Sequence, residues 1–239
     1  MPLYYPYYYY GFDFSDPLYA FSMVLLIVAI IVTAVAQAKV KSTFAKFSKS
    51  PTVLTGAQAA EKLLASQGVT NVKIERVSGS LTDHFDPRTN VIRLSEDVYD
   101  KNTVAAVGVA CHEAGHALQY ATGYSPIKLR NAIVPVTRIG SALAMPLILL
   151  GFLFAPFFAT LGVAFYALST LFQLITLPVE FNASRRAISI IRDYSILYDD
   201  SEISGAKKVL GAAAMTYLGA LLASLAQLLR LISMVNRRR

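Results

Sequence analysis

Long blocks of apolar residues dominate the pattern along this chain. Four of them are about 17–21 residues long, enough for a helix to cross a hydrocarbon layer of about 30 Å. They are residues 18–38, 139–155, 157–177 and 209–229. Pro156 separates the middle two, which predicts a transmembrane hairpin over residues 139–177. We therefore expect a mainly α-helical membrane protein with about four transmembrane helices.

Residues 39–138 contain no comparable apolar block and have a mixed pattern. Thr55 and Gln58 have the spacing of a capping box, and Gly68 is placed to end the helix that they begin. This stretch therefore predicts a small water-facing region between the first span and the hairpin.

The second half of this region combines strand and helix patterns. Short runs rich in β-branched residues predict strands over residues 72–77 and 91–94. Asn102 or Thr103 is placed to cap a helix that runs to about Tyr120. The region as a whole is predicted to be an α+β domain.

Three further segments complete the organisation. Residues 1–17 form a Tyr-rich tail without a core-forming pattern, typical of an interfacial or disordered segment. Pro178 is placed to open a polar helix from Glu180 to about Tyr194, and a loop completes the segment 178–208. Residues 209–239 comprise the last apolar block and a basic tail.

The distribution of basic residues predicts the orientation in the cell membrane. The net charge is +7, yet no Lys or Arg precedes Lys39, and thirteen of the 22 fall between Lys39 and Arg138. Loops rich in Lys and Arg stay on the cytoplasmic side, so residues 1–17 are expected outside and residues 39–138 inside. Four spans would then place the basic C-terminal tail outside, against this trend, unless the last block does not fully cross.

Composition narrows the class of protein further. Hydrophobic residues make up 55% of the chain and charged residues 15%, against about 25% charged in soluble domains. The basic residues are scattered and lack the grouping of a nucleic-acid site, so no nucleic-acid partner is expected. The single Cys111 excludes an internal disulfide.

The chemistry is concentrated in the predicted helix over residues 103–120. His112 and His116 are four residues apart, so both imidazoles lie on one helix face and can bind one Zn²⁺. Glu113 is adjacent and can act as the general base for a zinc-bound water. The alternative is an apolar helix that carries two histidines by chance, although the chain has only three.

A catalytic zinc with two His ligands needs a third protein ligand. Glu180 is the best candidate, because the two spans between it and His116 return it to the same side of the membrane. Its alternative role is an exposed Glu at a helix start, where the helix dipole favours it. Cys111, next to His112, is a weaker candidate for an additional ligand.

Four separated motifs together resemble the YugP-type family of neutral membrane zinc metallopeptidases. The resemblance extends from about Pro17 to Leu231 and includes the order of the spans. The motifs are residues 36–44, 78–88, 111–116 and 177–186 (AQAKVKSTF, SGSLTDHFDPR, CHEAGH and LPVEFNASRR).

A more distant resemblance is to the HtpX and CAAX-processing membrane proteases. These place a transmembrane hairpin between HExxH and a Glu-x-x-Ala-Asp motif whose Glu is the third zinc ligand. Glu180 and Ala183 match that motif, but Ser184 stands where the Asp is expected, which puts a carboxylate role at this position in doubt. His84 is either a group that contacts the reaction intermediate or substrate, or a turn residue.

The sequence thus predicts four transmembrane helices and a small cytoplasmic α+β zincin-like domain. Zinc is expected on His112, His116 and Glu180, with Glu113 as base, and membrane or membrane-near polypeptides are expected as substrates. One alternative is a membrane scaffold with a structural metal. Another is an intramembrane protease, which the charged residues Asp97 and Lys101 before the helix disfavour. Nothing in the sequence indicates the oligomeric state.

Overall fold

The computed structural model describes residues 14–236, so most of the Tyr-rich tail and Arg237–Arg239 lie outside the described residues. Within that range the chain is mostly helical, with one small sheet. The helices are α1 (Pro17–Phe47), α2 (Gly56–Ser66), α3 (Val104–Ala121), α4 (Ser125–Leu153), α5 (Pro156–Asp193) and α6 (Asp200–Asn236). The strands are β1 (Lys73–Arg76), β2 (His84–Asp86) and β3 (Val91–Leu94).

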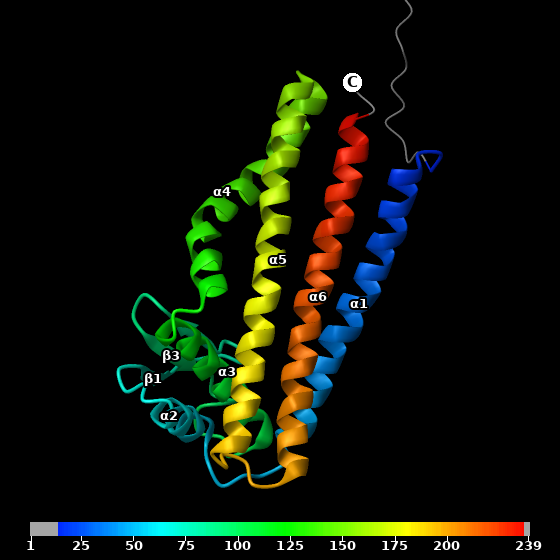
Figure 1. Cartoon of the computed structure of the whole chain (residues 1–239). Helices are drawn as coiled ribbons and strands as arrows, with labels where there is room; N and C mark the ends of the chain where they lie inside the picture. Colours follow the sequence, from blue (N-terminus) through cyan, green and yellow to red (C-terminus); the bar gives the residue numbers. More distant parts are fainter. Residues whose placement is uncertain (1–13, 237–239) are drawn as a thin grey trace, which may run out of the picture.

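Helices α1, α4, α5 and α6 are each long and apolar enough to cross a membrane, as the hydropathy pattern predicts. Figure 1 shows α5, α6 and α1 side by side along most of their lengths, with α4 against the upper part of α5. Large apolar side chains such as Ile31 and Leu149 are exposed on the outside of this bundle. An exposed apolar surface of this kind suits a lipid environment.

Helix α6 extends along the whole of α1. The hydroxyl of Ser233, near the end of α6, donates a hydrogen bond to Asp16, which caps the start of α1. Both helices therefore reach the same end of the bundle. If α1 crosses the bilayer, α6 crosses it as well, despite the basic tail that follows.

The expectation that a separate helix opens at Pro178 is wrong. Helix α5 continues through Pro178 from the apolar block into the polar segment. Proline removes one backbone donor and normally kinks or ends a helix. Here packing along α5 maintains the helix on both sides of the proline, as is common in membrane helices. Glu180 is consequently part of the same continuous helix as the preceding apolar block.

The part of the chain that the sequence predicts to face water is built on α2, α3 and the sheet, whose strand order is β1-β3-β2. Strand β1 pairs with β3 in parallel and β2 pairs with β3 antiparallel. The predicted strands correspond to β1 and β3, whereas β2 was not predicted as a strand. Its three residues are too short a run to show an alternating pattern.

Local capping signals in this part are confirmed. Thr55 and Gln58 form the reciprocal hydrogen bonds of a capping box at the start of α2. Gly68, just beyond α2, has a φ of 70°, which favours glycine. The Thr103 side chain accepts a hydrogen bond from the Ala106 amide and caps α3.

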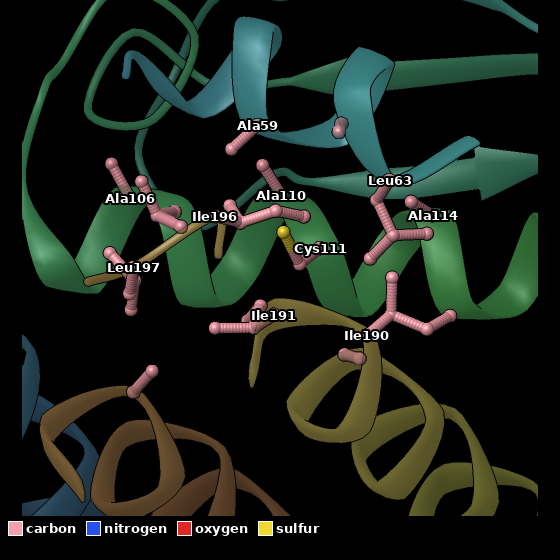
Figure 2. Close-up of a cluster of buried hydrophobic side chains, with 14 of the residues drawn as sticks. Ala59, Leu63, Ala106, Ala110, Cys111, Ala114, Ile190, Ile191, Ile196 and Leu197 are labelled. Atoms are coloured by element: carbon pink, nitrogen blue, oxygen red, sulfur yellow. The ribbon is translucent and has the colours of Figure 1, made fainter. Parts of the chain in front are cut away.

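The main apolar core lies between α2, α3 and the ends of α5 and α6. Figure 2 shows Leu63 of α2 and Ile191 of α5 packed on either side of α3, near Cys111. All three side chains are fully buried. This core fixes α3, and with it the histidine pair, against the membrane helices.

Candidate metal centre

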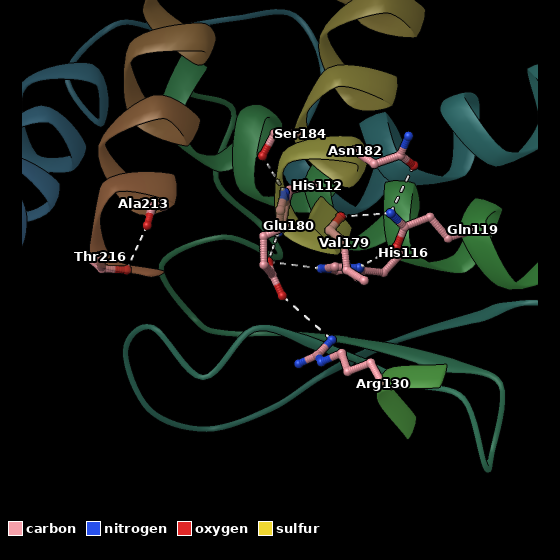
Figure 3. A network of polar contacts seen from close by, with 10 residues as sticks. All are labelled: His112, His116, Gln119, Arg130, Val179, Glu180, Asn182, Ser184, Ala213 and Thr216. Atoms are coloured by element: carbon pink, nitrogen blue, oxygen red, sulfur yellow. Dashed lines mark hydrogen bonds and ion pairs between the residues drawn. The ribbon is translucent and has the colours of Figure 1, made fainter. Parts of the chain in front are cut away.

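Three potential ligands from two helices meet at one point. His112 and His116 project from the same face of α3, as their spacing predicts, and α5 brings Glu180 opposite them (Figure 3). The Oε2 atom of Glu180 lies 3.3 Å from Nε2 of His112 and 3.4 Å from Nε2 of His116. The potential ligand atoms of the three residues all lie within 4.8 Å of one another.

Small residues allow α5 to approach α3 this closely. A Cβ atom built on Gly115 would lie 2.7 Å from the backbone oxygen of Ala183. Any larger residue at this position would therefore push the two helices apart. Gly115 lies next to His116, and Ala183 is three residues after Glu180 on α5. The glycine between the histidines therefore brings the glutamate within reach of them.

The donor set fits zinc. Glu180 is 2% exposed, and its buried Oε2 accepts no hydrogen bond although two imidazole nitrogens face it. A buried carboxylate oxygen in this position needs a cation. Two imidazole nitrogens and a carboxylate are the ligands of many catalytic zinc sites, which keep a further position for water. Among the described residues no fourth His, Cys, Asp or Glu joins the cluster.

A buried hydrogen-bond chain orients His116. Its Nδ1 lies 3.0 Å from Oε1 of Gln119, and the Gln119 amide nitrogen donates to the Val179 carbonyl and to Asn182. Because that amide nitrogen is a donor in both contacts, Oε1 is left to accept from the Nδ1–H of His116. The tautomer assigned in this way leaves Nε2 free to bind a metal.

Ser184 contacts the other histidine. Its hydroxyl oxygen lies 3.1 Å from Nδ1 of His112, close enough to accept the Nδ1–H. The residue that replaces the Asp of the related motif therefore still contacts a clustered histidine. The serine makes this contact without adding a negative charge to a site that already holds Glu113 and Glu180.

Glu113 and His84 both line a cavity of about 250 Å³ beside the three-residue cluster. Glu113 is buried on α3, and His84 is exposed on β2. His84 is not among the clustered ligands. Its Nδ1 lies 2.8 Å from the Thr82 carbonyl, to which it can donate. The structure thus brings both sequence-predicted groups to the cavity.

Side-chain hydrogen bonds hold the two ends of β2, which lines this cavity. Asp83 accepts from the amide and the hydroxyl of Ser95, while its partial burial raises the pKa of its carboxyl group. At the other end of β2, hydrogen bonds from the Thr89 hydroxyl and the Arg88 amide lower the pKa of Asp86 to about 2. Asp86 therefore stays ionised at ordinary pH and maintains the hydrogen bonds of the turn that follows β2.

Sequence reasoning missed Arg130, Tyr217 and Gln119 as members of the site. Arg130 of α4 and Tyr217 of α6 line the cavity, and Nη1 of Arg130 lies 3.6 Å from Oε1 of Glu180. Figure 3 shows Arg130 directed toward Glu180. A signal was available only for Gln119, whose position three residues after His116 places it on the same helix face.

The hypothesis that Cys111 is an additional ligand is not supported. Cys111 is fully buried in the apolar core, outside the three-residue cluster. Burial raises the pKa of its thiol. A thiol that stays protonated is a poor metal ligand.

Comparisons with known proteins agree with this geometry. The family described as "Putative neutral zinc metallopeptidase" matches residues 22–236. "Putative membrane protease YugP" of Bacillus subtilis (strain 168) is 46% identical over 200 residues, which are 82% of this chain and 88% of the relative. No solved structure matches the chain.

Four apolar helices make the protein a multi-pass membrane protein, and the family's cofactor is zinc. Both comparisons extend over most of the chain, including the helices that supply the clustered residues. The chain belongs to the neutral zinc metallopeptidase family.

Proposed function

We propose that this protein is a zinc-dependent endopeptidase that hydrolyses peptide bonds of membrane or membrane-near proteins at the cytoplasmic face. The observation that carries the proposal is the convergence of His112, His116 and Glu180 beside a cavity that Glu113 also lines. In this proposal the three clustered residues hold the metal. When bound, zinc would supply a water of lowered pKa and polarise the substrate carbonyl.

Glu113 would accept the proton of the attacking water and pass it to the leaving amine. Its position on α3 between the two histidines keeps it out of the ligand cluster but at the wall of the cavity. Arg130 would hold Glu180 in place through their ion pair. His84, which also lines the cavity, would hydrogen-bond the bound peptide or the tetrahedral intermediate.

Strand β2 offers a backbone edge for an extended substrate. In the strand order β1-β3-β2 its outer edge has no partner strand among the described residues. His84 and Phe85 of this strand both line the cavity. A peptide that added to this edge would lie across the metal centre.

The alternative of a membrane scaffold with a structural metal has less support. Structural zinc sites are closed by four protein ligands, whereas the described cluster has three and opens on a cavity.

Metal analysis combined with a degradation assay tests the proposal. Purified protein is expected to contain about one zinc per chain and to degrade an unfolded substrate such as casein. A chelator should remove both the zinc and the activity, and added zinc should restore both, because the ligands come from the folded protein. Tight zinc binding without hydrolysis of any polypeptide would favour the scaffold instead.

The proposed orientation has its own test. In a Cys111→Ala background, a cysteine placed at Ser15 is expected to react with a membrane-impermeant thiol reagent added to intact cells. A cysteine at Ser201, which is also exposed but lies at the other end of the bundle, should react only after the membrane is opened. The reverse pattern would place the metal centre outside the cell.

A further inference from the structure

Two close contacts between α1 and α6 show which residues of the two helices lie at the same height along the bundle. A Cβ atom on Gly205 would touch the ring of Phe47, and one on Gly219 would touch Thr33. Fourteen residues separate the two contacts on each helix. The two antiparallel helices therefore keep one register between these contacts. For a residue of α6, this register gives the residue of α1 that lies at the same height along the bundle.

The same reasoning places the metal cluster. The Thr170 hydroxyl of α5 lies 2.7 Å from the Ser224 hydroxyl of α6. Glu180 is ten residues after Thr170, and Ala214 is ten residues before Ser224, so Glu180 is level with Ala214. By the α1–α6 register, Ala214 is level with Ala38.

Helix α4 agrees with this height. The hydroxyls of Ser141 and Ser169 lie 2.7 Å apart on α4 and α5. Arg130 is eleven residues before Ser141, and Glu180 is eleven residues after Ser169. In the register set by these two serines, Arg130 and Glu180 lie at the same height, in agreement with their ion pair.

Ala38 is the last residue of the first apolar block, and Lys39 follows it directly. At a rise of about 1.5 Å per residue the 21 residues of this block span about 31 Å, the thickness of the hydrocarbon layer. The clustered ligands are therefore level with the boundary between hydrocarbon and headgroups. They lie neither at the middle of the bilayer nor in a domain held away from it.

Exposed side chains mark the same boundary. Val35 on α1, Leu129 on α4 and Phe181 on α5 are 60%, 51% and 43% exposed, and all three lie close to this level. Lys39 and Lys41 are the next exposed charges on α1. Arg138 on α4 lies deeper, where a long side chain can extend along the helix toward the headgroups.

The residues that line the cavity come from both sides of this boundary. His84 and Pro87 come from the water-facing part, while Val134 and Tyr217 come from membrane helices. We infer that the centre takes peptide bonds at the end of a substrate's transmembrane segment, within about one helical turn of the hydrocarbon. This substrate class rests on the proposed peptidase function.

The depth of the site can be measured without any activity. The chain has no tryptophan, so a single introduced Trp reports its own position. We choose Phe181→Trp next to Glu180, with Ile27→Trp as a control at the middle of the first span and Val53→Trp as a control in the water-facing loop. All three positions are exposed. Quenching is measured in vesicles of phosphatidylcholine brominated near the headgroup end or near the methyl end of the acyl chains.

Phe181→Trp is expected to be quenched most by bromine near the headgroup end. Ile27→Trp should be quenched most by bromine near the methyl end, and Val53→Trp by a water-soluble quencher alone. If Phe181→Trp behaved like either control, the inferred height of the metal centre would be wrong.

A cleavage series tests the substrate class in the same vesicles. Model substrates carry one transmembrane helix and a cleavable sequence after about 4 or about 25 flexible residues. The near site is expected to be cut about tenfold faster, because its local concentration at the boundary is higher. The Glu113→Gln protein is the inactive control for both substrates. Faster cutting of the far site would overturn the inference. Failure to cut either site would reject the peptidase function and with it the substrate class, while the depth measurement would stand separately.

Discussion

Glu113→Gln is expected to abolish peptide hydrolysis while leaving the zinc and the fold in place. The carboxamide has nearly the same shape as the carboxylate but cannot accept the proton of the attacking water. Loss of a general base lowers rates by about 10²–10⁴-fold. Because Glu113 is not one of the three clustered residues, metal binding should not depend on it.

The measurements are the turnover of a peptide or casein substrate, the zinc content and the thermal unfolding temperature. Glu61→Gln is the matched control, because Glu61 is an exposed glutamate on α2, away from the cavity. The control should behave like the parent protein in all three measurements. A Glu113→Gln protein that cleaves at the parent rate would remove Glu113 from the mechanism.

Glu180→Ala is expected to weaken zinc binding strongly and to abolish activity. Loss of a residue that only orients a ligand costs about 10–100-fold in metal affinity, so loss of a ligand should cost more than about 100-fold. The change also leaves Arg130 without the carboxylate that it faces. His112→Ala and His116→Ala should have the same effect on zinc.

Asp193→Ala is the matched control for Glu180. Asp193 is also an acidic residue of α5, but it is exposed and accepts a hydrogen bond from Ser189. Glu202 is a poorer control, because it accepts hydrogen bonds from the amides of Tyr198 and Asp199 at the start of α6. In a structure with zinc, a Glu180 oxygen should lie about 2.0–2.2 Å from the metal. Full zinc occupancy in Glu180→Ala would assign the third ligand elsewhere.

Ser184 and Gln119 show how the two clustered histidines are held by different side chains. Gln119 contacts Nδ1 of His116 with its amide oxygen, and Ser184 contacts Nδ1 of His112 with its hydroxyl. Both contacts are uncharged. Among the described residues, the carboxylates that line the cavity are those of Glu113, Glu180 and Asp83.

Features that depend on neighbours along the chain could be predicted from the sequence. The helix period places His112 and His116 on one face, the apolar blocks set the positions of the membrane helices, and Thr55 caps α2. Glu180 could be proposed from the return of the hairpin to the same side of the membrane. Each of these features depends on local hydrogen bonds, on the period of the side chains or on the thickness of the bilayer. All three leave a pattern in the order of the residues along the sequence.

Only the tertiary structure decided which groups surround the metal centre and where it lies. Arg130 and Tyr217 come from different membrane helices, and β2 exists only through its pairing with β3. Packing kept α5 helical across Pro178, although proline by itself predicted a break there. The height that we infer for the centre, at the membrane boundary, rests on the registers between α1, α4, α5 and α6. Those registers are set by close contacts between distant residues, such as Gly219 with Thr33, which no local pattern records.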